Sequence, residues 1–168
     1  MKKIAIFGCP GSGKSTFATK LSKKLNIPVY HLDKYFFKQN WQEVGLEIFM
    51  GQQKNILSTE QWIVEGCSMR SLELRFQAAD LLICLDIPRR TCLWRVIKRW
   101  WTGRLTDCKP ENCPEVLRFV FLKYVWGYRK KYGPKSEYLQ NLVQKYPHKK
   151  LLIFKSNEQA DQWLENIT

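Results

Sequence analysis

The chain has 168 residues, 45% of them hydrophobic, which predicts one folded domain with a substantial core. Lysine and arginine number 28 against 15 acidic residues, a formal net charge of +13. This charge predicts a polyanionic partner, either a nucleotide or a nucleic acid bound without sequence preference. The apolar run after the start is too short for a signal peptide and no run suits a membrane span, so we expect no membrane contact and a cytoplasmic protein.

The most specific signal lies at residues 8–15, which fit the Walker A motif G-x-x-x-x-G-K-[ST] of a phosphate-binding P-loop. Apolar residues before it predict a buried strand, and a helix with Phe17 and Leu21 on one face follows it. The glycines let backbone N–H groups converge on a phosphate, and the helix N-terminus adds partial positive charge. The expected nucleotide contacts in this loop are Gly8, Gly11, Ser12, Gly13, Lys14, Ser15 and Thr16.

Two side chains of the motif have distinct expected roles. Lys14 should reach the β- and γ-phosphates of ATP, and Ser15 should ligate the Mg²⁺ ion that accompanies it. The competing fingerprint of dinucleotide-binding proteins, G-x-G-x-x-G, does not fit, because the glycines stand at positions 8, 11 and 13.

The second predicted strand, residues 29–33, ends on Asp33. Ligands of open α/β sheets bind outside the carboxyl ends of the strands, so Asp33 is a candidate functional residue, with a loop-capping role as the alternative. His31 is expected to pack inward. Residues 34–61 are rich in aromatic side chains and are expected to cover the acceptor site. These rings either stack on a base or belong to the core.

The third predicted strand, residues 62–66, carries Glu65, which could orient the water ligands of Mg²⁺, and Arg70 follows it. The fourth, residues 81–87, is the most apolar, and Pro88 begins the next helix in a favoured position. Strands that alternate with helices imply a parallel sheet buried on both faces.

The helix at residues 89–101 is expected to place Leu93, Val96, Ile97 and Trp100 inward. Arg95 and Arg99 stand four residues apart and therefore share another face, where they form either a phosphate clamp or a solvated basic stripe.

Residues 102–114 contain Arg104 and hardly any apolar side chains, which predicts a lid-type loop. A long helix at residues 115–131 then carries Arg129. Another helix, a fifth strand at residues 150–155 and a closing amphipathic helix at residues 157–167 complete the chain.

Together these stretches resemble the adenylate-kinase-like P-loop kinases, and within them the group labelled DNA topology modulation proteins. The likeness rests on residues 8–15, on His31-Leu32-Asp33 with the aromatic run to Trp41, on Val64-Glu65-Gly66 with Arg70, on Leu85-Asp86-Ile87-Pro88 with Arg95 and Arg99, and on Arg104 with Cys113-Pro114-Glu115. The resemblance implies a three-layer α/β P-loop NTPase fold. Its parallel five-stranded sheet would have the order 2-3-1-4-5, with a lid, in one domain spanning residues 1–168.

In nucleoside monophosphate kinases, an arginine shortly after the third strand holds the acceptor phosphate. Arginines seven and eleven residues after the proline of the fourth strand meet the nucleoside triphosphate and its lid, and Arg70, Arg95 and Arg99 match these positions. The chain departs from this family at the third strand, where Glu65-Gly-Cys-Ser-Met-Arg70 replaces the usual Asp-Gly, aromatic, Pro and Arg.

These features predict an ATP-dependent, Mg²⁺-dependent kinase of an anionic small molecule, in first place a nucleoside monophosphate. The expected catalytic residues are Lys14, Arg95, Arg99 and Asp33; Arg95 and Arg104 would also bind the nucleotide; and Asp33, Glu65, Arg70 and Arg129 would bind the acceptor. One alternative is a hydroxyl acceptor, as in shikimate or gluconate kinases, with Asp33 as the base. The other is an ATP-linked nucleic-acid-binding protein that modulates DNA topology.

Overall fold

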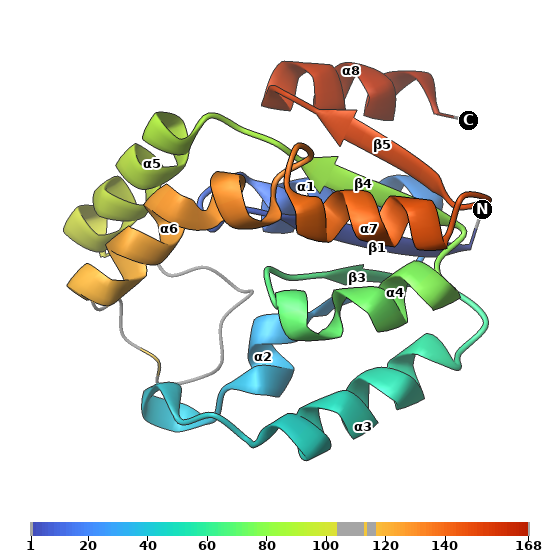
Figure 1. Ribbon diagram of the computed structural model, residues 1–168, viewed down its shortest axis with the longest axis horizontal. Helices are drawn as coiled ribbons and strands as arrows, with labels where there is room; N and C mark the ends of the chain where they lie inside the picture. Colours follow the sequence, from blue (N-terminus) through green and yellow to red (C-terminus); the bar gives the residue numbers. More distant parts are fainter. Residues whose placement is uncertain (1, 104–112, 114–116, 168) are drawn as a thin grey trace.

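The computed structural model describes residues 2–103, 113 and 117–167 (Figure 1). Arg104 and most of the predicted lid, residues 102–114, lie outside this part of the chain.

Five parallel strands form the central sheet in the order β2-β3-β1-β4-β5, which confirms the predicted order (Figure 1). The central strands β1, β3 and β4 are almost entirely buried, as their continuous apolar sequences require. The strands are β1 Lys3–Gly8, β2 Val29–His31, β3 Trp62–Glu65, β4 Leu81–Leu85 and β5 Lys150–Phe154.

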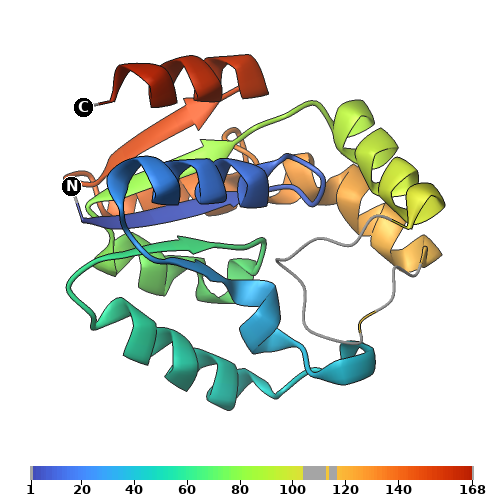
Figure 2. The ribbon, with the colours of Figure 1, turned by 180° about the vertical axis from the view of Figure 1, so that it is seen from behind.

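Helices cover both faces of the sheet, with α1 and α8 on one face and α4 and α7 on the other (Figures 1 and 2). The α5 and α6 helices pack against each other beyond the carboxyl ends of the strands. None of the described helices is both long and apolar enough to cross a membrane. The helices are α1 Lys14–Leu25, α2 Leu32–Phe36, α3 Leu46–Leu57, α4 Leu72–Ala78, α5 Arg89–Thr102, α6 Phe119–Tyr132, α7 Glu137–Lys145 and α8 Asn157–Asn166, with short 3-10 turns at Gln39–Trp41 and Met69–Ser71.

The orientation of α5 differs from the prediction in one respect. Trp100 was expected inward but is 43% exposed, whereas Cys92 and Val96 are buried. The far end of α5 extends past the sheet, so that no strand lies beneath it (Figure 1). Its last aromatic residues therefore remain at the surface.

The aromatic side chains at the start of the predicted covering segment belong to a small core of their own. Phe36 meets Phe37 and the fully buried Phe49 edge to face, with ring centroids 4.7 and 4.8 Å apart, and Phe37 meets Trp41 at 5.2 Å. Such edge-to-face pairs stabilise local packing. These rings therefore pack on one another, and stacking on a base stays a prediction. The Cys113 thiol donates to the Lys38 carbonyl at 3.2 Å, which ties this segment to the chain beyond α5.

A fully buried arginine of α4 holds the segment after β3. The Arg75 guanidinium donates to the backbone carbonyl of Gly66 at 3.2 Å and to that of Ser68. Burial lowers its pKa to about 10, which still leaves the side chain charged at neutral pH. Arg75 thus shapes the loop that follows Glu65, and the sequence contained no signal for this role.

Candidate functional site

The loop between β1 and α1 has the backbone that a phosphate cradle needs. Gly11 and Gly13 have φ values of 82° and 89°, a region that residues with a Cβ rarely adopt. The Ser12 amide donates to the Cys9 carbonyl at 3.0 Å and closes the turn. A Cβ on Gly11 would lie 2.4 Å from the Cys92 carbonyl oxygen, so the loop packs directly against α5.

Lys14 begins α1 and is only 7% exposed. Burial acts to lower the pKa of its ammonium, but Cys67 and the carboxylates of Glu65 and Asp33 outweigh burial and raise this pKa above its usual value. Lys14 therefore carries a positive charge beside the cradle.

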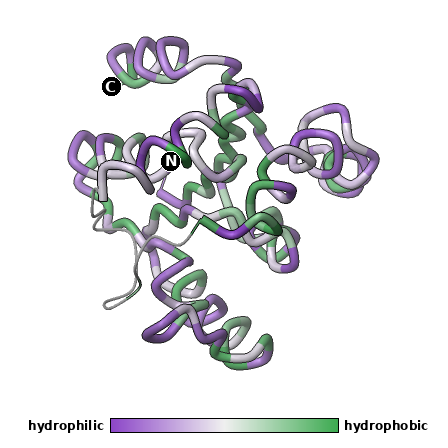
Figure 3. Tube along the Cα trace, turned by 90° about the vertical axis from the view of Figure 1, so that its left-hand side faces the viewer, coloured by the Kyte–Doolittle hydropathy of each residue, from purple (hydrophilic) through white to green (hydrophobic). Residues whose placement is uncertain are grey.

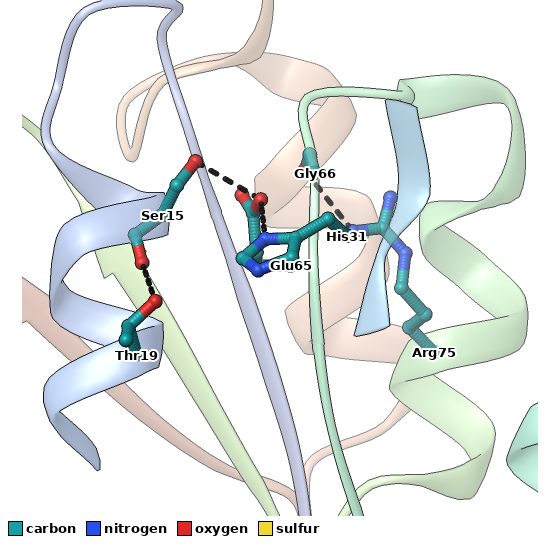
Figure 4. A network of polar contacts seen from close by, with 6 residues as sticks. All are labelled: Ser15, Thr19, His31, Glu65, Gly66 and Arg75. Carbon is teal, nitrogen blue, oxygen red and sulfur yellow. Dashed lines mark hydrogen bonds and ion pairs between the residues drawn. The ribbon is translucent and has the colours of Figure 1, made fainter. Parts of the chain in front are cut away.

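The carboxylate of Glu65, the last residue of β3, connects three elements (Figure 4). Its Oε1 accepts a hydrogen bond from the Ser15 hydroxyl at 3.0 Å and lies 2.7 Å from His31 Nδ1. Burial raises the pKa of this carboxyl, but the His31 hydrogen bond, the charge of Lys14 and the Ser15 hydrogen bond together lower it below its usual value. Glu65 is therefore ionised at neutral pH.

His31 lies inward as expected, with 13% of its side chain exposed, but its ring is also a polar partner of Glu65, a role that the expectation did not include. The two residues are direct partners in the parallel register of β2 and β3, and both end their strands. The sequence did contain a signal for this contact, because both predicted strands carry a polar residue near the carboxyl end. The pairing was missed because the sequence does not reveal which residues of two neighbouring strands stand opposite each other.

Asp33 lies in a helix and not, as was predicted, at the end of the preceding strand. The strand β2 ends at His31, and Asp33 is the second residue of α2, at the same edge of the sheet. Burial raises the pKa of its carboxyl and Glu65 adds to the rise, while Lys14 and Arg99 oppose it. The structure thus brings Asp33 into electrostatic contact with Lys14, Glu65 and Arg99.

Arg95 reaches the P-loop through a residue that sequence reasoning missed. Its guanidinium donates to the Asn157 side-chain oxygen at 2.7 Å, and the Asn157 amide donates to the Ser12 carbonyl at 3.0 Å. A Cβ on Gly13 would lie 2.8 Å from that amide nitrogen. Asn157 begins α8, and only the tertiary fold brings it to the loop.

The remaining predicted arginines lie in different surroundings. Arg129 donates from Nε and Nη2 to the two carboxylate oxygens of Asp86, each hydrogen bond being 2.8 Å long. Arg70 is exposed in the turn after β3. Arg104 belongs to the residues that the structure does not describe.

The donor set near Ser15 fits Mg²⁺ held mainly through phosphates. The Ser15 hydroxyl donates its proton to Glu65 and keeps its oxygen lone pairs for an ion, and Glu65 Oε2 is buried with no hydrogen-bond partner in the described part of the chain. The part of the chain that the structure describes contains no group of three or more His, Cys, Asp or Glu side chains able to hold a metal ion. Mg²⁺ commonly takes only one or two protein ligands together with substrate phosphates and water.

A glycine-rich cradle between the first strand and first helix of a parallel 2-3-1-4-5 sheet defines a P-loop protein with the predicted three-layer fold. The chain belongs to the AAA domain family, whose model matches residues 4–112. None of the curated proteins compared with the chain matches it in sequence.

Solved structures of P-loop kinases share this fold. Shikimate kinase from Aquifex aeolicus has a TM-score of 0.58 and 18% identity over 96% of this chain and 90% of that chain. Deoxyadenosine kinase from M. mycoides has a TM-score of 0.54 and 14% identity over 97% of both chains. A candidate kinase from Chloroflexus aurantiacus has a TM-score of 0.57 and 16% identity over the full length of both chains. At these identities the likeness concerns the fold, and the finer resemblance to DNA topology modulation proteins stays a prediction.

The lowered pKa of Glu65 makes a prediction for acid stability. Its ionised form stabilises the fold fully above its unfolded-state pKa of about 4.3, and this contribution is lost as the pH falls through the lower folded-state value. Glu65→Gln should therefore lower the free energy of unfolding at pH 7 and flatten its decline in acid. Urea denaturation between pH 7 and pH 3 measures both effects.

The exposed Glu60→Gln is the matched control and should follow the wild-type profile. Parallel profiles for Glu65→Gln and the wild type would show that the carboxylate adds nothing to stability.

Proposed function

We propose that the protein is an ATP- and Mg²⁺-dependent phosphotransferase that acts on a small molecule. The observation that carries this proposal is the buried, charged Lys14 between the phosphate cradle and two carboxylates, Glu65 and Asp33. A protein that only binds nucleotide has no need for a second acidic group at this point. Phosphoryl transfer requires held phosphates, neutralised charge and a positioned acceptor.

The residues of the nucleotide half have roles that follow from their positions. Backbone amides of the cradle bind the phosphates, and Lys14 neutralises charge on the transferred group. Arg95, oriented by Asn157, and Arg99, which acts on the charge of Asp33, would neutralise further phosphate charge from α5. Mg²⁺, when bound, would neutralise part of the charge that develops on the phosphates. Ser15 and Glu65 are the residues placed to hold it or its waters.

The surroundings of Asp33 favour a hydroxyl group as the acceptor. A hydroxyl needs a carboxylate to take its proton or to orient it, and a base works best when its pKa is raised toward the working pH. Burial moves the pKa of Asp33 in that direction. Arg129, which was expected at the acceptor, donates its Nε and Nη2 to Asp86, so that one edge of its guanidinium is already engaged. We therefore place a small hydroxylated acceptor first.

A nucleoside monophosphate remains the second candidate, because Arg70 is exposed at the turn where an acceptor phosphate would be held. A phosphate acceptor is already a nucleophile and needs arginine rather than a base. The two candidates therefore differ in their demand on Asp33.

Lys14→Ala should lower ATP-dependent phosphoryl transfer at least a hundredfold while the protein stays folded, because a preorganised cation at the developing charge is lost. Turnover with ATP, Mg²⁺ and a panel of hydroxylated and phosphorylated small molecules measures the effect. Lys23→Ala removes an exposed lysine of the same helix and should leave turnover unchanged. Equal activity of the wild type and Lys14→Ala would remove the kinase mechanism.

Asp33→Asn separates the two acceptor classes. With a hydroxyl acceptor, the variant should lose roughly a hundredfold to ten-thousandfold in kcat/KM, as expected for a lost general base. Wild-type activity should fall as the pH drops through the raised pKa of Asp33, and this acid limb should disappear in the variant. A full rate for Asp33→Asn on the best acceptor would exclude the base role and favour the phosphate acceptor.

Asn157→Ala should weaken binding of a non-hydrolysable ATP analogue about tenfold, because Arg95 and the P-loop lose their shared partner. If Asn157 acts partly through Arg95, the double variant Arg95→Ala/Asn157→Ala loses less affinity than the sum of the two single losses. Gln159→Ala removes another side chain from the start of α8 and serves as the control. Additive losses in titration calorimetry would show that Asn157 does not position Arg95.

A further inference from the structure

The helices α5 and α6 carry more positive charge than the nucleotide site uses. They contain five and four basic residues respectively, and neither contains an acidic residue. The inner faces are accounted for, since Cys92 and Val125 are buried and Arg95 serves the P-loop. Figure 3 views the molecule from the side on which these helices lie. Their outer faces have no part in the proposed phosphotransfer.

The outer face of α5 alternates cations with aromatic rings. Arg90, Trp94, Lys98 and Trp101 are spaced by three or four residues and therefore form one stripe along the helix. All four are exposed, Trp94 at 63% and Trp101 at 81%. Arg95 lies about 100° further round the helix from Trp94 and faces the P-loop. The stripe is thus distinct from the phosphate clamp.

The outer face of α6 repeats the pattern. Phe119, Lys123, Trp126 and Lys130 share one side of the helix by the same spacing, and all are exposed, Phe119 at 73% and Trp126 at 44%. The Lys123 ammonium lies 5.4 Å from the centroid of the Phe119 ring.

A contact between the helices links the α6 stripe to Arg89, the residue before the first member of the α5 stripe. The Arg89 guanidinium of α5 lies over the Trp126 ring of α6, 4.1 Å from its centroid. We refer to the outer stripes of α5 and α6, with Arg89, as the aromatic-basic surface.

We propose that the aromatic-basic surface binds single-stranded nucleic acid. Unpaired bases would stack on the exposed rings, and the sugar-phosphate backbone would follow the cations that stand between them. This combination of aromatic platforms with a positively charged track is the general chemistry of single-strand recognition. The net charge of +13 would add long-range attraction for such a polyanion.

The alternation itself argues against other occupants. A helix that lies in a membrane interface separates its apolar face from its cations, whereas here Trp94 stands between Arg90 and Lys98 on one face. A second copy of the chain would bring like charges together. Duplex nucleic acid offers phosphates but keeps its bases stacked, so it cannot use the rings.

The direct test is the affinity of the purified protein for a fluorescent 20-nucleotide oligo(dT), measured by anisotropy. Trp94→Ala and Trp101→Ala should each weaken binding about 5-fold to 150-fold, the effect of one missing stacking partner. Ile48→Ala removes a side chain that is 57% exposed on α3 and should leave the affinity unchanged. Because Trp94 and Trp101 are exposed, both variants should melt at the wild-type temperature.

The salt dependence tests the cations separately. Lys98→Ala/Lys130→Ala should reduce the slope of log affinity against log salt by about 0.7 for each phosphate that the variant no longer neutralises. Lys23→Ala/Lys54→Ala removes the same charge from exposed positions on α1 and α3 and should leave the slope nearly unchanged. Saturating Mg²⁺-ATP should not displace the oligonucleotide, because the stripe faces away from the P-loop.

Several results would overturn the proposal. These are equal affinity for oligo(dT) and for a duplex of the same length, equal losses in Trp94→Ala and Ile48→Ala, displacement by Mg²⁺-ATP, or binding to phosphatidylserine vesicles without binding to the oligonucleotide.

Discussion

The arrangement of the site depends on the contacts that the buried Glu65 carboxylate makes. Its ionised state is held by Ser15 and His31 and by the charge of Lys14, and it in turn helps to keep Lys14 protonated. Each charge would be costly to bury alone, and together they hold α1, β2 and β3 in one geometry at the carboxyl edge of the sheet. The cradle, the cation and the proposed base at Asp33 are all arranged around this carboxylate.

The inner and outer faces of helix α5 belong to two different surfaces of the protein. Its inner face carries Arg95 to the P-loop by way of Asn157, while its outer face alternates Trp94 with Arg90 and Lys98. Because the residues that would serve each surface do not overlap, variants of one face can be studied while the other stays intact. A basic helix that looks uniform in sequence thus divides into a side linked to the P-loop and an outer side.

The arginines that seemed equivalent in sequence separate by their partners. Arg75 is buried and holds the turn after β3, and Arg129 is bound to Asp86, so both have structural contacts. Arg95 is linked to the P-loop through Asn157 and Arg99 acts on the charge of Asp33, while Arg70 is exposed in the turn after β3. This division weakens the argument for a phosphate acceptor and strengthens the one for a hydroxyl.

The sequence alone determined the P-loop, the strand-helix alternation and the position of Asp33 at the carboxyl edge, because local periodicity and glycine spacing encode them. The sheet order was predicted through the family resemblance and is confirmed. Only the tertiary structure decided that His31 meets Glu65, that Asn157 joins Arg95 to the loop, and that Trp100 is exposed. These contacts join residues 34 to 145 positions apart, or depend on where a helix outruns the sheet, and local patterns do not encode such distances.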